Sequence, residues 1–460
     1  MQITVSNVIT VDRPPRELLS WCTQNLRIRN PEYAKKQRMH FWVGNTPEWL
    51  YLYEIHGDQL VLPYGVLRNI FPMIDGGELN FPVAKQIDYG CKVPLYDYQE
   101  KAVEAMYWQQ YGILQSAAGS GKTQMGIALI AKLGKRALWL THTKDLLTQS
   151  KQRAEQYMDK SLLGTITEGK VDIGKGITFA TVQTMCNLDL SQYKDYWDVI
   201  IVDECHRVAG TPTAVSQFSK VLNALAARHK YGLSATVHRS DGLIQATFAL
   251  LGDVVYTVPT EAVADKIMKV GICPVPTGIR IVRSCLNSDG TLNYTKLIGY
   301  LTESEERNRQ IVECITADRD KPGLILSDRL SHLETLMSML PPEMREDAVM
   351  VSGKMTTKKG KAEREQAIED MRTGKKKYLF ATYSLCKEGL DIPRLERLYM
   401  GSPISDYAVV TQSIGRIARI FPGKADPVVY DFVDDIQFLV KAYKKRCTTY
   451  RKNGCYFVER

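Results

Sequence analysis

The sequence predicts an α/β protein in which two parallel-sheet domains follow one another and a small α+β module precedes them. The chain has 460 residues, a length that suits about three domains. Short apolar runs alternate twice with segments of helical periodicity, a pattern typical of parallel sheets with helices on both faces. A loop rich in glycine and serine, residues 115–123, lies between one apolar run and one helical segment. Ligands of such sheets bind at the carboxyl ends of the strands.

Composition indicates an ordinary soluble globular protein, with 44% hydrophobic and 24% charged residues. The net charge of +9 fits an anionic polymer partner, although residues 441–460 alone hold seven Lys/Arg and one Asp/Glu and are equally explained as a solvated basic tail. The ten cysteines form no Cys-x-x-Cys pair, so we expect reduced thiols and no zinc ribbon. Residues 1–5 are strand-like, and no run of about 18 apolar residues occurs. We therefore expect a protein without membrane contact, cytoplasmic in a bacterial or phage-infected cell or nuclear in a eukaryote.

Residues 1–92 are interpreted as an accessory module. The stretches 49–55 and 59–62 predict a hairpin, and residues 17–26 predict a short helix. A basic cluster beside Phe41 and Trp42 can hold a phosphate backbone next to a stacking surface, while packing in the core is the alternative for these aromatic residues. This cluster comprises Arg27, Arg29, Lys35, Lys36 and Arg38. Residues 71–92, rich in proline and glycine, predict a linker.

Two series of expected strands define the rest of the domain organisation. In the first domain, residues 93–258, strands are expected at 112–115, 137–141, 177–181, 199–203 and 231–234. In the second, residues 303–440, they are expected at 324–327, 348–352, 378–381, 398–401 and 428–432. Residues 259–302 predict a bridging segment, and residues 441–460 predict a basic C-terminal tail.

The loop at residues 115–123 has the pattern of a phosphate-binding loop. Backbone N–H groups and the N-terminus of the following helix surround the phosphates in such loops, the lysine reaches the terminal phosphates, and the hydroxyl beside it binds Mg²⁺. The general motif has glycine where this chain has Ser116. The loop predicts ATP and Mg²⁺ as ligands, held by Ser116, Ala117, Ala118, Gly119, Ser120, Gly121, Lys122 and Thr123.

The second element of this site is Asp203-Glu204-Cys205-His206, which follows a four-residue apolar run 81 residues after Lys122. Carboxylates at a strand end suit ATP hydrolysis. Asp203 is expected to hold Mg²⁺ together with Thr123, and Glu204 to polarise the water that attacks the γ-phosphate. An exposed acidic turn is the alternative.

At this point the chain resembles the superfamily 2 helicases, because further motifs follow in family order across residues 96–419. They are Tyr96-Asp97-Tyr98-Gln99, Leu140-Thr141-His142-Thr143-Lys144, Ala180-Thr181-Val182-Gln183, Gly232-Leu233-Ser234-Ala235-Thr236, Leu326-Ser327-Asp328-Arg329, Ala381-Thr382-Tyr383-Ser384 and Glu388-Gly389-Leu390-Asp391. The resemblance implies two tandem RecA-like domains and an ATP-hydrolysing DNA helicase.

The resemblance also implies roles for individual residues. Nucleotide contacts are expected from Tyr98, Gln99, Gly389 and Asp391. Coupling of hydrolysis to strand movement is expected from His206, Ser234 and Thr236. Contacts with the nucleic-acid backbone, which carry no sequence information, are expected from Thr141, Lys144, Thr181, Gln183, Arg239, Ser327, Arg329 and Thr382.

Gln412, Arg416 and Arg419 complete the expected catalytic set. On a helix they lie at positions i, i+4 and i+7 and project from one face. Two guanidinium groups that reach the γ-phosphate from the second domain stabilise transition-state charge when the domains close. A solvated basic helix face is the alternative.

Within the superfamily, Gly232 to Asp241 is similar to a stretch of XPB-related DNA helicases and phage UvsW-type branch-migration helicases. Ser240 stands where that branch has an acidic residue. The resemblance implies single-stranded, duplex or branched DNA as substrate and a role in repair, recombination or replication. We expect a monomer that works with replication or recombination proteins.

Two other functions remain open from the sequence. An RNA helicase is one, because Asp-Glu-Cys-His also occurs in RNA helicases of the DExH type. The other is a nucleotide-dependent binding switch or the motor subunit of a larger nucleic-acid-processing complex.

Overall fold

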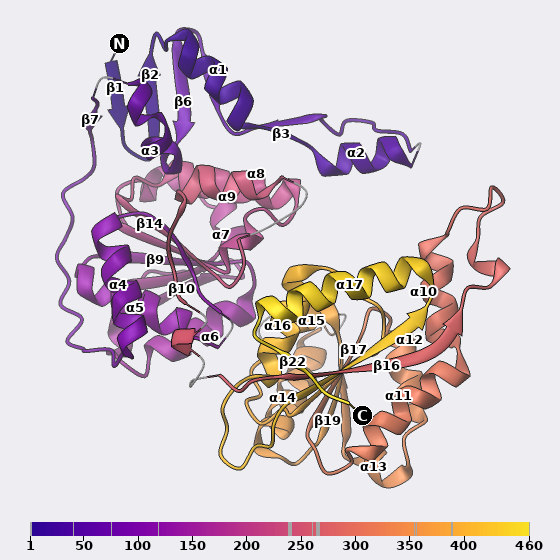
Figure 1. Ribbon diagram of the computed structural model, residues 1–460. Helices are drawn as coiled ribbons and strands as arrows, with labels where there is room; N and C mark the ends of the chain where they lie inside the picture. Colours follow the sequence, from indigo (N-terminus) through magenta and orange to yellow (C-terminus); the bar gives the residue numbers. More distant parts are fainter. Residues whose placement is uncertain are drawn as a thin grey trace. The chain divides into compact units, whose positions relative to one another are not determined.

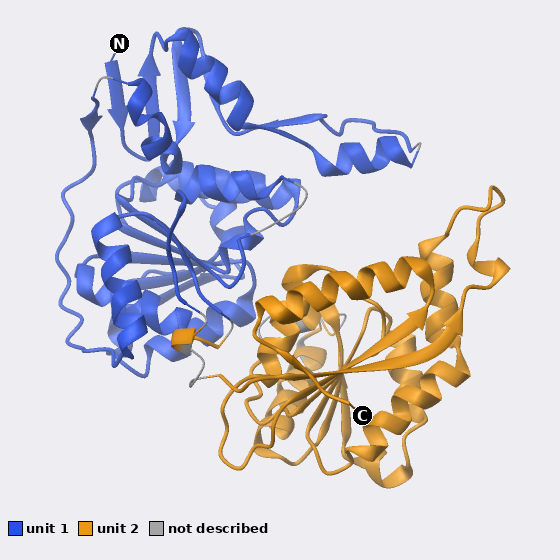
Figure 2. Ribbon diagram, viewed as in Figure 1, with its two compact units in different colours: residues 1–117, 121–259 blue, residues 118–120, 260–460 orange. Residues whose placement is uncertain are grey.

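The computed structural model describes residues 2–39, 41–74, 76–117, 119–237, 242–259, 261–263, 267–353, 355, 357–387 and 390–459. The chain forms two compact units (Figure 2), one of residues 1–117 and 121–259 and the other of residues 118–120 and 260–460. Each unit contains one large sheet of predominantly parallel strands, as the sequence predicts. None of the described helices is both long enough and apolar enough to cross a lipid bilayer.

The N-terminal module has a five-stranded sheet in the order β5-β6-β2-β1-β7. Its strands are β1 (Gln2–Val5), β2 (Val8–Asp12), β5 (Glu54–His56), β6 (Gln59–Pro63) and β7 (Glu78–Leu79). Leu18 and Cys22 of α1 (Arg16–Asn25) pack against apolar residues of this sheet. The expected hairpin forms between β5 and β6, but its first strand is shorter than predicted. Residues 49–51 instead form β4 (Trp49–Tyr51), which pairs with β3 (Arg27–Arg29).

β3 and β4 are the two sides of an arm that extends from the module (Figure 1) and carries α2 (Pro31–Arg38). The guanidinium of Arg27 lies 4.5 Å from the centre of the Trp49 ring, a cation–π contact between the two strands. At the base of the arm, Ile28 and Leu50 pack with residues of the first large domain, among them Val215 and Ile244.

The module is held on the first large domain by hydrogen bonds from buried side chains. The ammonium of Lys230, 0% exposed, donates to the carbonyls of Asn7 at 3.1 Å and Leu222 at 2.6 Å. The Tyr64 hydroxyl donates to the Arg228 carbonyl at 3.0 Å. Burial lowers the pKa of Lys230 to about 7.

The large sheet of the first unit has eight strands in the order β11-β10-β12-β9-β13-β14-β8-β15. They are β8 (Gly112–Gln115), β9 (Ala137–Thr141), β10 (Leu163–Thr167), β11 (Lys170–Asp172), β12 (Ile177–Thr181), β13 (Val199–Asp203), β14 (His229–Ser234) and β15 (Val254–Thr257). Neighbouring strands are parallel except β10 and β11. β8, β9, β12 and β13 have the predicted bounds.

Helices cover both faces of this sheet (Figure 1). Apolar residues of α7, α8 and α9 share one core with the strands, while α4, α5 and α6 lie on the opposite face. The helices of this unit not yet given are α3 (Leu67–Ile70), α4 (Asp97–Gln109), α5 (Lys122–Leu133), α6 (Lys144–Ala154), α7 (Val182–Cys186), α8 (Pro212–Ala224) and α9 (Ile244–Leu251).

The sheet of the second unit has seven parallel strands in the order β18-β19-β17-β20-β21-β16-β22. They are β16 (Gly271–Arg280), β17 (Gly323–Ser327), β18 (Ala348–Val351), β19 (Tyr378–Thr382), β20 (Arg397–Met400), β21 (Val428–Asp435) and β22 (Tyr456–Phe457). Its helices are α10 (Tyr294–Glu303), α11 (Glu305–Ala317), α12 (Leu330–Ser338), α13 (Pro342–Glu346), α14 (Lys358–Thr373), α15 (Tyr383–Lys387), α16 (Tyr407–Ile417) and α17 (Gln437–Lys452).

Strand β16 corrects the expectation that residues 259–302 only bridge the domains. It pairs with β21 from Gly271 to Pro276 and is an integral part of the second sheet. Pro274 and Pro276 argued against a strand, because proline has no N–H to donate. The carbonyls of Val270 and Ile272 accept hydrogen bonds from the N–H groups of Tyr456, in β22, and of Val458, directly after it. The backbone polar groups of even-numbered residues in β16 therefore point toward the β22 side of the strand. β22 pairs only with Gly271 and Ile272, and the prolines lie beyond the end of this pairing.

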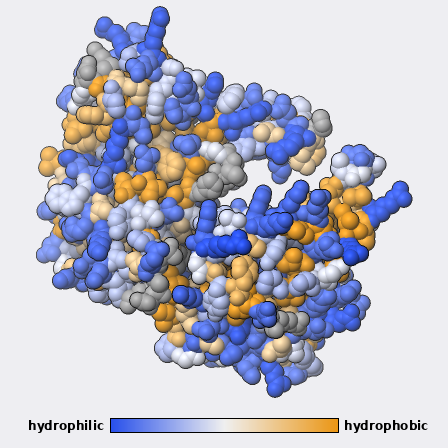
Figure 3. All heavy atoms as spheres, viewed as in Figure 1, coloured by the Kyte–Doolittle hydropathy of each residue, from blue (hydrophilic) through white to orange (hydrophobic). Residues whose placement is uncertain are grey.

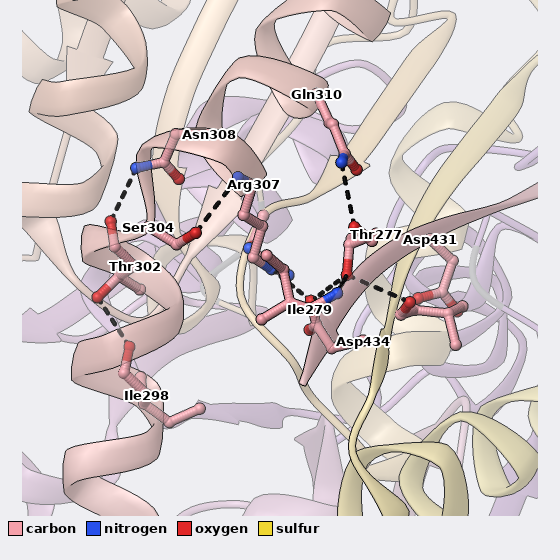
Figure 4. A network of polar contacts seen from close by, with 12 residues as sticks. Thr277, Ile279, Ile298, Thr302, Ser304, Arg307, Asn308, Gln310, Asp431 and Asp434 are labelled. Atoms are coloured by element: carbon pink, nitrogen blue, oxygen red, sulfur yellow. Dashed lines mark hydrogen bonds and ion pairs between the residues drawn. The ribbon is translucent and has the colours of Figure 1, made fainter. Parts of the chain in front are cut away.

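A buried polar network fixes β16 in place (Figure 4). Nε of Arg307, on α11, lies 2.8 Å from Oδ1 of Asp434, on β21, and both side chains are at most 1% exposed. The Thr277 hydroxyl of β16 donates to the same carboxylate oxygen at 2.7 Å. Nη1 of Arg307 donates to the Gly401 carbonyl at 2.5 Å. One arginine thus joins α11 to two strands and to the residue after β20.

The expected basic tail, residues 441–460, is largely helix α17. Arg446 is 3% exposed and binds the Asp431 carboxylate with two nitrogens, Nε at 2.9 Å and Nη2 at 2.8 Å. The Tyr450 hydroxyl, also buried, donates to Asp431 at 2.6 Å. Two residues of the expected solvated segment therefore belong to the core, because a carboxylate on β21 compensates the buried guanidinium.

Candidate nucleotide site

The phosphate-binding loop follows β8 and leads into α5. Gly119 and Gly121 adopt positive φ angles of +85° and +81°, a conformation that favours glycine. A Cβ atom on Gly121 would lie 2.4 Å from Nε2 of Gln99, so a side chain at this position would displace the Gln99 amide. Ser116 is 1% exposed, and its N–H donates to the Ser234 carbonyl at 3.0 Å. Ala118 lies outside the described residues.

Lys122 is the first residue of α5, and Thr123 follows it in the first turn. Lys122 is 9% exposed, and its ammonium donates to the carbonyls of Ser116 at 3.2 Å and Ala117 at 3.3 Å. The Lys122 ammonium group thus lies within the phosphate-binding loop, bonded to the loop's own backbone carbonyls. Together with the helix N-terminus, it makes the loop a site for a phosphate chain.

Asp203 ends β13, at the carboxyl edge of the sheet. Ser150 donates its hydroxyl to Oδ2 of Asp203 at 3.1 Å, and the N–H of Glu204 donates to Oδ1 at 3.0 Å. Burial and the neighbouring negative charge of Glu204 raise the pKa of Asp203 to about 6, although Lys122 opposes the shift. The sequence did not single out Ser150, because it lies 53 residues away on α6 and no local pattern marks it.

The oxygen donors here fit Mg²⁺ that arrives with phosphates. Mg²⁺ is usually held by one or two carboxylates, with waters and phosphate oxygens as its other ligands. Asp203 offers one buried carboxylate, and Thr123 lies in the first turn of the helix that follows the phosphate loop. Among the described residues, no group of three or more His, Cys, Asp or Glu side chains could hold a metal ion.

His206 connects the carboxylates to the next strand. Its Nδ1 lies 3.3 Å from Oε2 of Glu204 and 3.0 Å from Oγ of Ser234, at the end of β14. Ser234 donates its hydroxyl to the carbonyl of Thr236 at 2.6 Å and accepts from the Thr236 N–H at 3.1 Å. The structure therefore brings together the three residues expected to couple hydrolysis to movement. Glu204 itself has φ +48°, which directs the chain sharply away from the strand.

Gln99 and Tyr98 lie at the start of α4, beside the loop. Gln99 is 2% exposed, and its Oε1 accepts from the Tyr96 N–H at 3.0 Å. The rings of Tyr96 and Tyr98 stack with centres 5.9 Å apart. Because the Gln99 amide lies against Gly121, the expected adenine-binding residues and the phosphate loop are neighbours.

The remaining residues of the expected catalytic set lie in the second unit, and one helical prediction is wrong. α16 ends at Ile417, so Gln412 and Arg416 share a helix but Arg419 lies beyond it. Arg419 forms an ion pair with Asp391, and Nη1 of Arg416 donates to the Leu390 carbonyl at 3.0 Å. Both arginines are thereby joined to the expected nucleotide-binding segment. Gly389 lies outside the described residues.

Lys424 holds this segment and was not predicted. Its ammonium donates to the carbonyls of Ile417 and Arg419, both at 2.7 Å, and of Pro393 at 3.0 Å. These three bonds end α16 and tie the residues after it to the segment that contains Asp391. Burial lowers the pKa of Lys424 to about 8. A lone lysine seven residues after a helix gives no sequence pattern that would reveal this role.

Three of the expected nucleic-acid contacts have side chains inside the protein. Thr141 and Ser327 are 0% exposed and Thr181 is 7% exposed. Their hydroxyls contact the Thr143 carbonyl at 3.0 Å, Nδ1 of His332 at 2.9 Å and the Thr184 hydroxyl at 2.9 Å, respectively.

The other expected contacts are partly or fully accessible. Lys144 pairs with Glu168 at 2.7 Å, Gln183 contacts His142 at 3.2 Å, Arg329 donates to the Thr295 carbonyl at 2.9 Å, and Thr382 contacts Ser384 at 2.9 Å. Arg239 lies outside the described residues, as do Ser240 and Asp241.

Comparison with protein families gives two matches in the order of the two sheets. Residues 92–239 match the family described as the type III restriction enzyme res subunit. Residues 306–421 match the helicase conserved C-terminal domain. The first match spans the phosphate loop and the carboxylates, and the second spans Gln412, Arg416 and Arg419.

Among the proteins similar in sequence, the DNA 3'-5' translocase XPB2 of Sulfurisphaera tokodaii is 24% identical over 74% of this chain and 81% of its own. L396 of Acanthamoeba polyphaga mimivirus is 25% identical over 92% of this chain and 78% of its own, and its name provisionally assigns an ATP-dependent RNA helicase.

A solved structure supports the fold. S. cerevisiae Dbp5 bound to RNA and ADP BeF3 aligns with a TM-score of 0.56 at 18% identity, over 86% of this chain and 94% of that chain. T4 UvsW aligns over 100% of this chain and 99% of its own at 17% identity, with a TM-score of 0.42. The two RecA-like domains expected from the sequence are thus confirmed.

Proposed function

Because the chain belongs to the superfamily 2 helicases and is an ATP-dependent enzyme, we propose that it unwinds or remodels duplex, forked or branched DNA. In this proposal the first unit binds ATP and the second supplies the arginines that complete hydrolysis. Contacts with the phosphate backbone move the protein along one strand, as expected of XPB-related and UvsW-type branch-migration helicases.

At the phosphate loop, Lys122 would leave the carbonyls of Ser116 and Ala117 and bind the terminal phosphates of ATP. Glu204 would orient the attacking water and accept its proton, so that the water oxygen can attack the γ-phosphate. Asp203 and Thr123 would hold Mg²⁺, which when bound neutralises charge that develops on the phosphate oxygens.

Arg416 and Arg419 would stabilise the transition state when the two units close on ATP. Gln412, one helical turn before Arg416, would position the γ-phosphate or the water. Hydrolysis then depends on closure, and closure changes how the two units contact the DNA backbone. This dependence is what converts ATP hydrolysis into movement.

The observation that carries the proposal is the chain of contacts from Glu204 through His206 to Ser234. A carboxylate that senses the γ-phosphate is linked, through one imidazole, to the end of a different strand. That arrangement supports coupling of ATP hydrolysis to a conformational change, which a simple ATP-binding protein does not need.

The test is ATP hydrolysis measured without nucleic acid and with single-stranded, duplex and forked DNA, together with an unwinding assay on the forked substrate. We expect forked or single-stranded DNA to stimulate hydrolysis at least ten-fold, and Lys122→Ala and Glu204→Gln to abolish both activities. Absence of stimulation by every DNA would overturn the proposal. Unwinding that survives in both variants would favour a nucleotide-dependent binding switch.

Two alternatives are supported by particular matches. The similarity to L396 favours an RNA helicase, so an RNA duplex with the sequence of the DNA fork belongs in the same assay. The match of residues 92–239 to a restriction-enzyme subunit favours a motor that acts for a partner enzyme. Copurification of the chain with a nuclease would support that second alternative.

A further inference from the structure

The arm of residues 27–51 presents large apolar side chains to solvent at its end. Met39 is 49% exposed, Phe41 60% and Trp42 87%. These three residues lie within four positions of the end of α2, so their exposed apolar side chains occur together in one short segment. Exposed apolar surface gathered at one place marks a binding site more often than scattered residues do.

The end of the arm has a built framework rather than an open loop. Asn30, 1% exposed, caps α2 by accepting from the Glu32 N–H at 2.9 Å and donates its amide to the Pro47 carbonyl at 2.9 Å. The ammonium of Lys36 donates to the Thr46 hydroxyl at 2.6 Å. These bonds join α2 and its cap to the residues that precede β4, so the two sides of the arm are connected near its end.

The ring of Trp42 is supported from one side only. Gly44 has φ +52°, and a Cβ atom there would lie 2.9 Å from the indole ring. The ring therefore rests on the backbone of Gly44. With 87% of the residue exposed, the rest of the indole is available to a flat partner. A planar ring backed by main chain and open to solvent is a suitable stacking surface.

The charge of the arm indicates what kind of partner fits. Residues 27–51 contain five Lys/Arg and two Asp/Glu. The two acidic residues are already paired, Glu48 with Arg29 at 3.5 Å and Glu32 with Lys36 at 3.4 Å. Lys35 and Arg38, which directly precede the aromatic residues, are exposed on α2. An anionic partner with flat apolar groups matches this combination, and a nucleic-acid strand with unpaired bases has both properties.

A hollow of about 600 Å³, lined by both polar and apolar residues, lies between the arm and the start of α8. Lys36, Asn45, Thr46, Thr213 and Ser216 are among its lining residues. On the face drawn in Figure 3, hydrophilic and apolar side chains lie side by side on the arm. Amide, hydroxyl and ammonium groups of this kind suit a sugar-phosphate backbone, which carries no base information.

We propose that the arm binds unpaired bases at a fork or branch, with Trp42 and Phe41 as the stacking surface and Lys35 and Arg38 as contacts to the adjoining phosphates. The inference rests on the proposed function, because it names the part of the DNA that this module recognises. It gives the module a preference for strand junctions over uninterrupted duplex, since a paired base is not available for stacking on a side chain.

The test compares Trp42→Ala, Trp42→Phe and Trp108→Ala with the unchanged chain. Trp108, 76% exposed on α4, is a matched control because it is also an accessible tryptophan of the first unit. Affinity is measured by fluorescence anisotropy at fixed salt, for a forked DNA and for a blunt duplex of equal length. The fork carries 2-aminopurine as its first unpaired base, so stacking is detected directly as quenching.

We expect Trp42→Ala to weaken fork binding about 5- to 50-fold, in the range of one lost base–aromatic stack, and to change duplex binding less than two-fold. Quenching of 2-aminopurine should be lost in Trp42→Ala and kept in Trp42→Phe and Trp108→Ala. Equal fork binding by Trp42→Ala and the unchanged chain would overturn the inference. An equal loss for fork and duplex would also overturn it, as would an equal loss in Trp108→Ala.

ATP hydrolysis separates failure of this inference from failure of the proposed function. If forked DNA stimulates the unchanged chain and Trp42→Ala to the same extent, with the same half-saturating DNA concentration, only the role of the arm is wrong. If no DNA stimulates the unchanged chain, the proposed function is wrong.

Discussion

The Nδ1 atom of His206 lies 3.3 Å from the Glu204 carboxylate and contacts the Ser234 hydroxyl with the same nitrogen. One imidazole therefore links the carboxylate directly after β13 to the end of β14. In the proposed function, a change at Glu204 during hydrolysis would reach the neighbouring strand through this contact.

Replacing His206 by alanine should uncouple hydrolysis from nucleic acid. Glu204 and Lys122 remain in place, so we expect hydrolysis without DNA to fall less than ten-fold, while stimulation by forked DNA falls at least ten-fold. Steady-state hydrolysis at saturating ATP, with and without DNA, measures both quantities. Full stimulation in His206→Ala would show that coupling follows another route.

Gly121 and Gly119 form a matched pair of substitutions. Both have positive φ, so alanine at either costs about 1–2 kcal/mol of backbone strain. Only a Cβ on Gly121 meets another atom, Nε2 of Gln99 at 2.4 Å, whereas one on Gly119 meets nothing within 4 Å. We expect Gly121→Ala to weaken ATP binding at least ten-fold more than Gly119→Ala. Titration with a fluorescent ATP analogue checks this, and equal effects would exclude a role for the Gln99 contact.

Lys230 makes stability depend on pH. Its folded pKa of about 7 lies below the ordinary 10.5, so the unfolded chain binds more protons between these values. Stability therefore rises with pH from about 7 to 10.5, by at most about 1.4 kcal/mol per pH unit, and this gain is lost progressively as the pH falls from 10.5 to about 7. The urea-unfolding midpoint of the unchanged chain should rise relative to Lys230→Met over this range. A constant difference would contradict the prediction, and the exposed Lys170→Met serves as control.

Lys424 should position the arginines without touching ATP. Its loss removes three hydrogen bonds to the segment that carries Arg419, and a displacement of about 1 Å at a catalytic group costs about 100-fold in rate. We expect Lys424→Ala to lower kcat 10- to 100-fold and to change KM for ATP less than three-fold. The exposed Lys441→Ala is the control. A larger change in KM than in kcat would indicate a binding role instead.

Arg446 should stabilise the second unit. Removing it leaves Asp431 as an uncompensated buried charge, which typically costs about 3–5 kcal/mol. We expect a marked fall in the unfolding midpoint of Arg446→Ala and little change in Arg451→Ala, on the exposed side of the same helix. Thermal unfolding followed by circular dichroism compares the two. If Arg446→Ala kept its stability, the expectation that residues 441–460 form a solvated basic tail would hold for this residue.

Local patterns predicted much of the fold and of the candidate site. The apolar runs at β8, β9, β12 and β13 gave correct strand bounds, because a fully buried parallel strand is a continuous apolar segment. Lys122, Asp203 and Glu204 could be found because each belongs to a short motif at the carboxyl end of such a strand, β8 for Lys122 and β13 for the two carboxylates. The structure then placed His206 and Ser234 in contact, as the resemblance implied.

Features that depend on distant partners could not be predicted. Strand β16 was missed because its prolines are typical of a linker. The strand accommodates them because its pairing with β22 ends at Ile272, before the first proline. Arg446 read as part of a solvated basic run, because its partner Asp431 lies on another element. Ser150 binds a carboxylate 53 residues away, and Lys424 joins carbonyls near its own position to one 31 residues before it, contacts that no spacing rule predicts.

Strand β16 also has a consequence for how the protein is made. It is the first strand of its sheet to leave the ribosome, yet its neighbours β21 and β22 are the last. About 150 residues must be synthesised before Thr277 and Arg307 can meet Asp434, so ten residues of strand wait without a partner. Pro274 and Pro276, which made the strand hard to predict, would then protect it from pairing with other chains, since proline has no N–H to donate to a neighbouring strand. The same residues that make β16 hard to recognise would keep the nascent chain from aggregating.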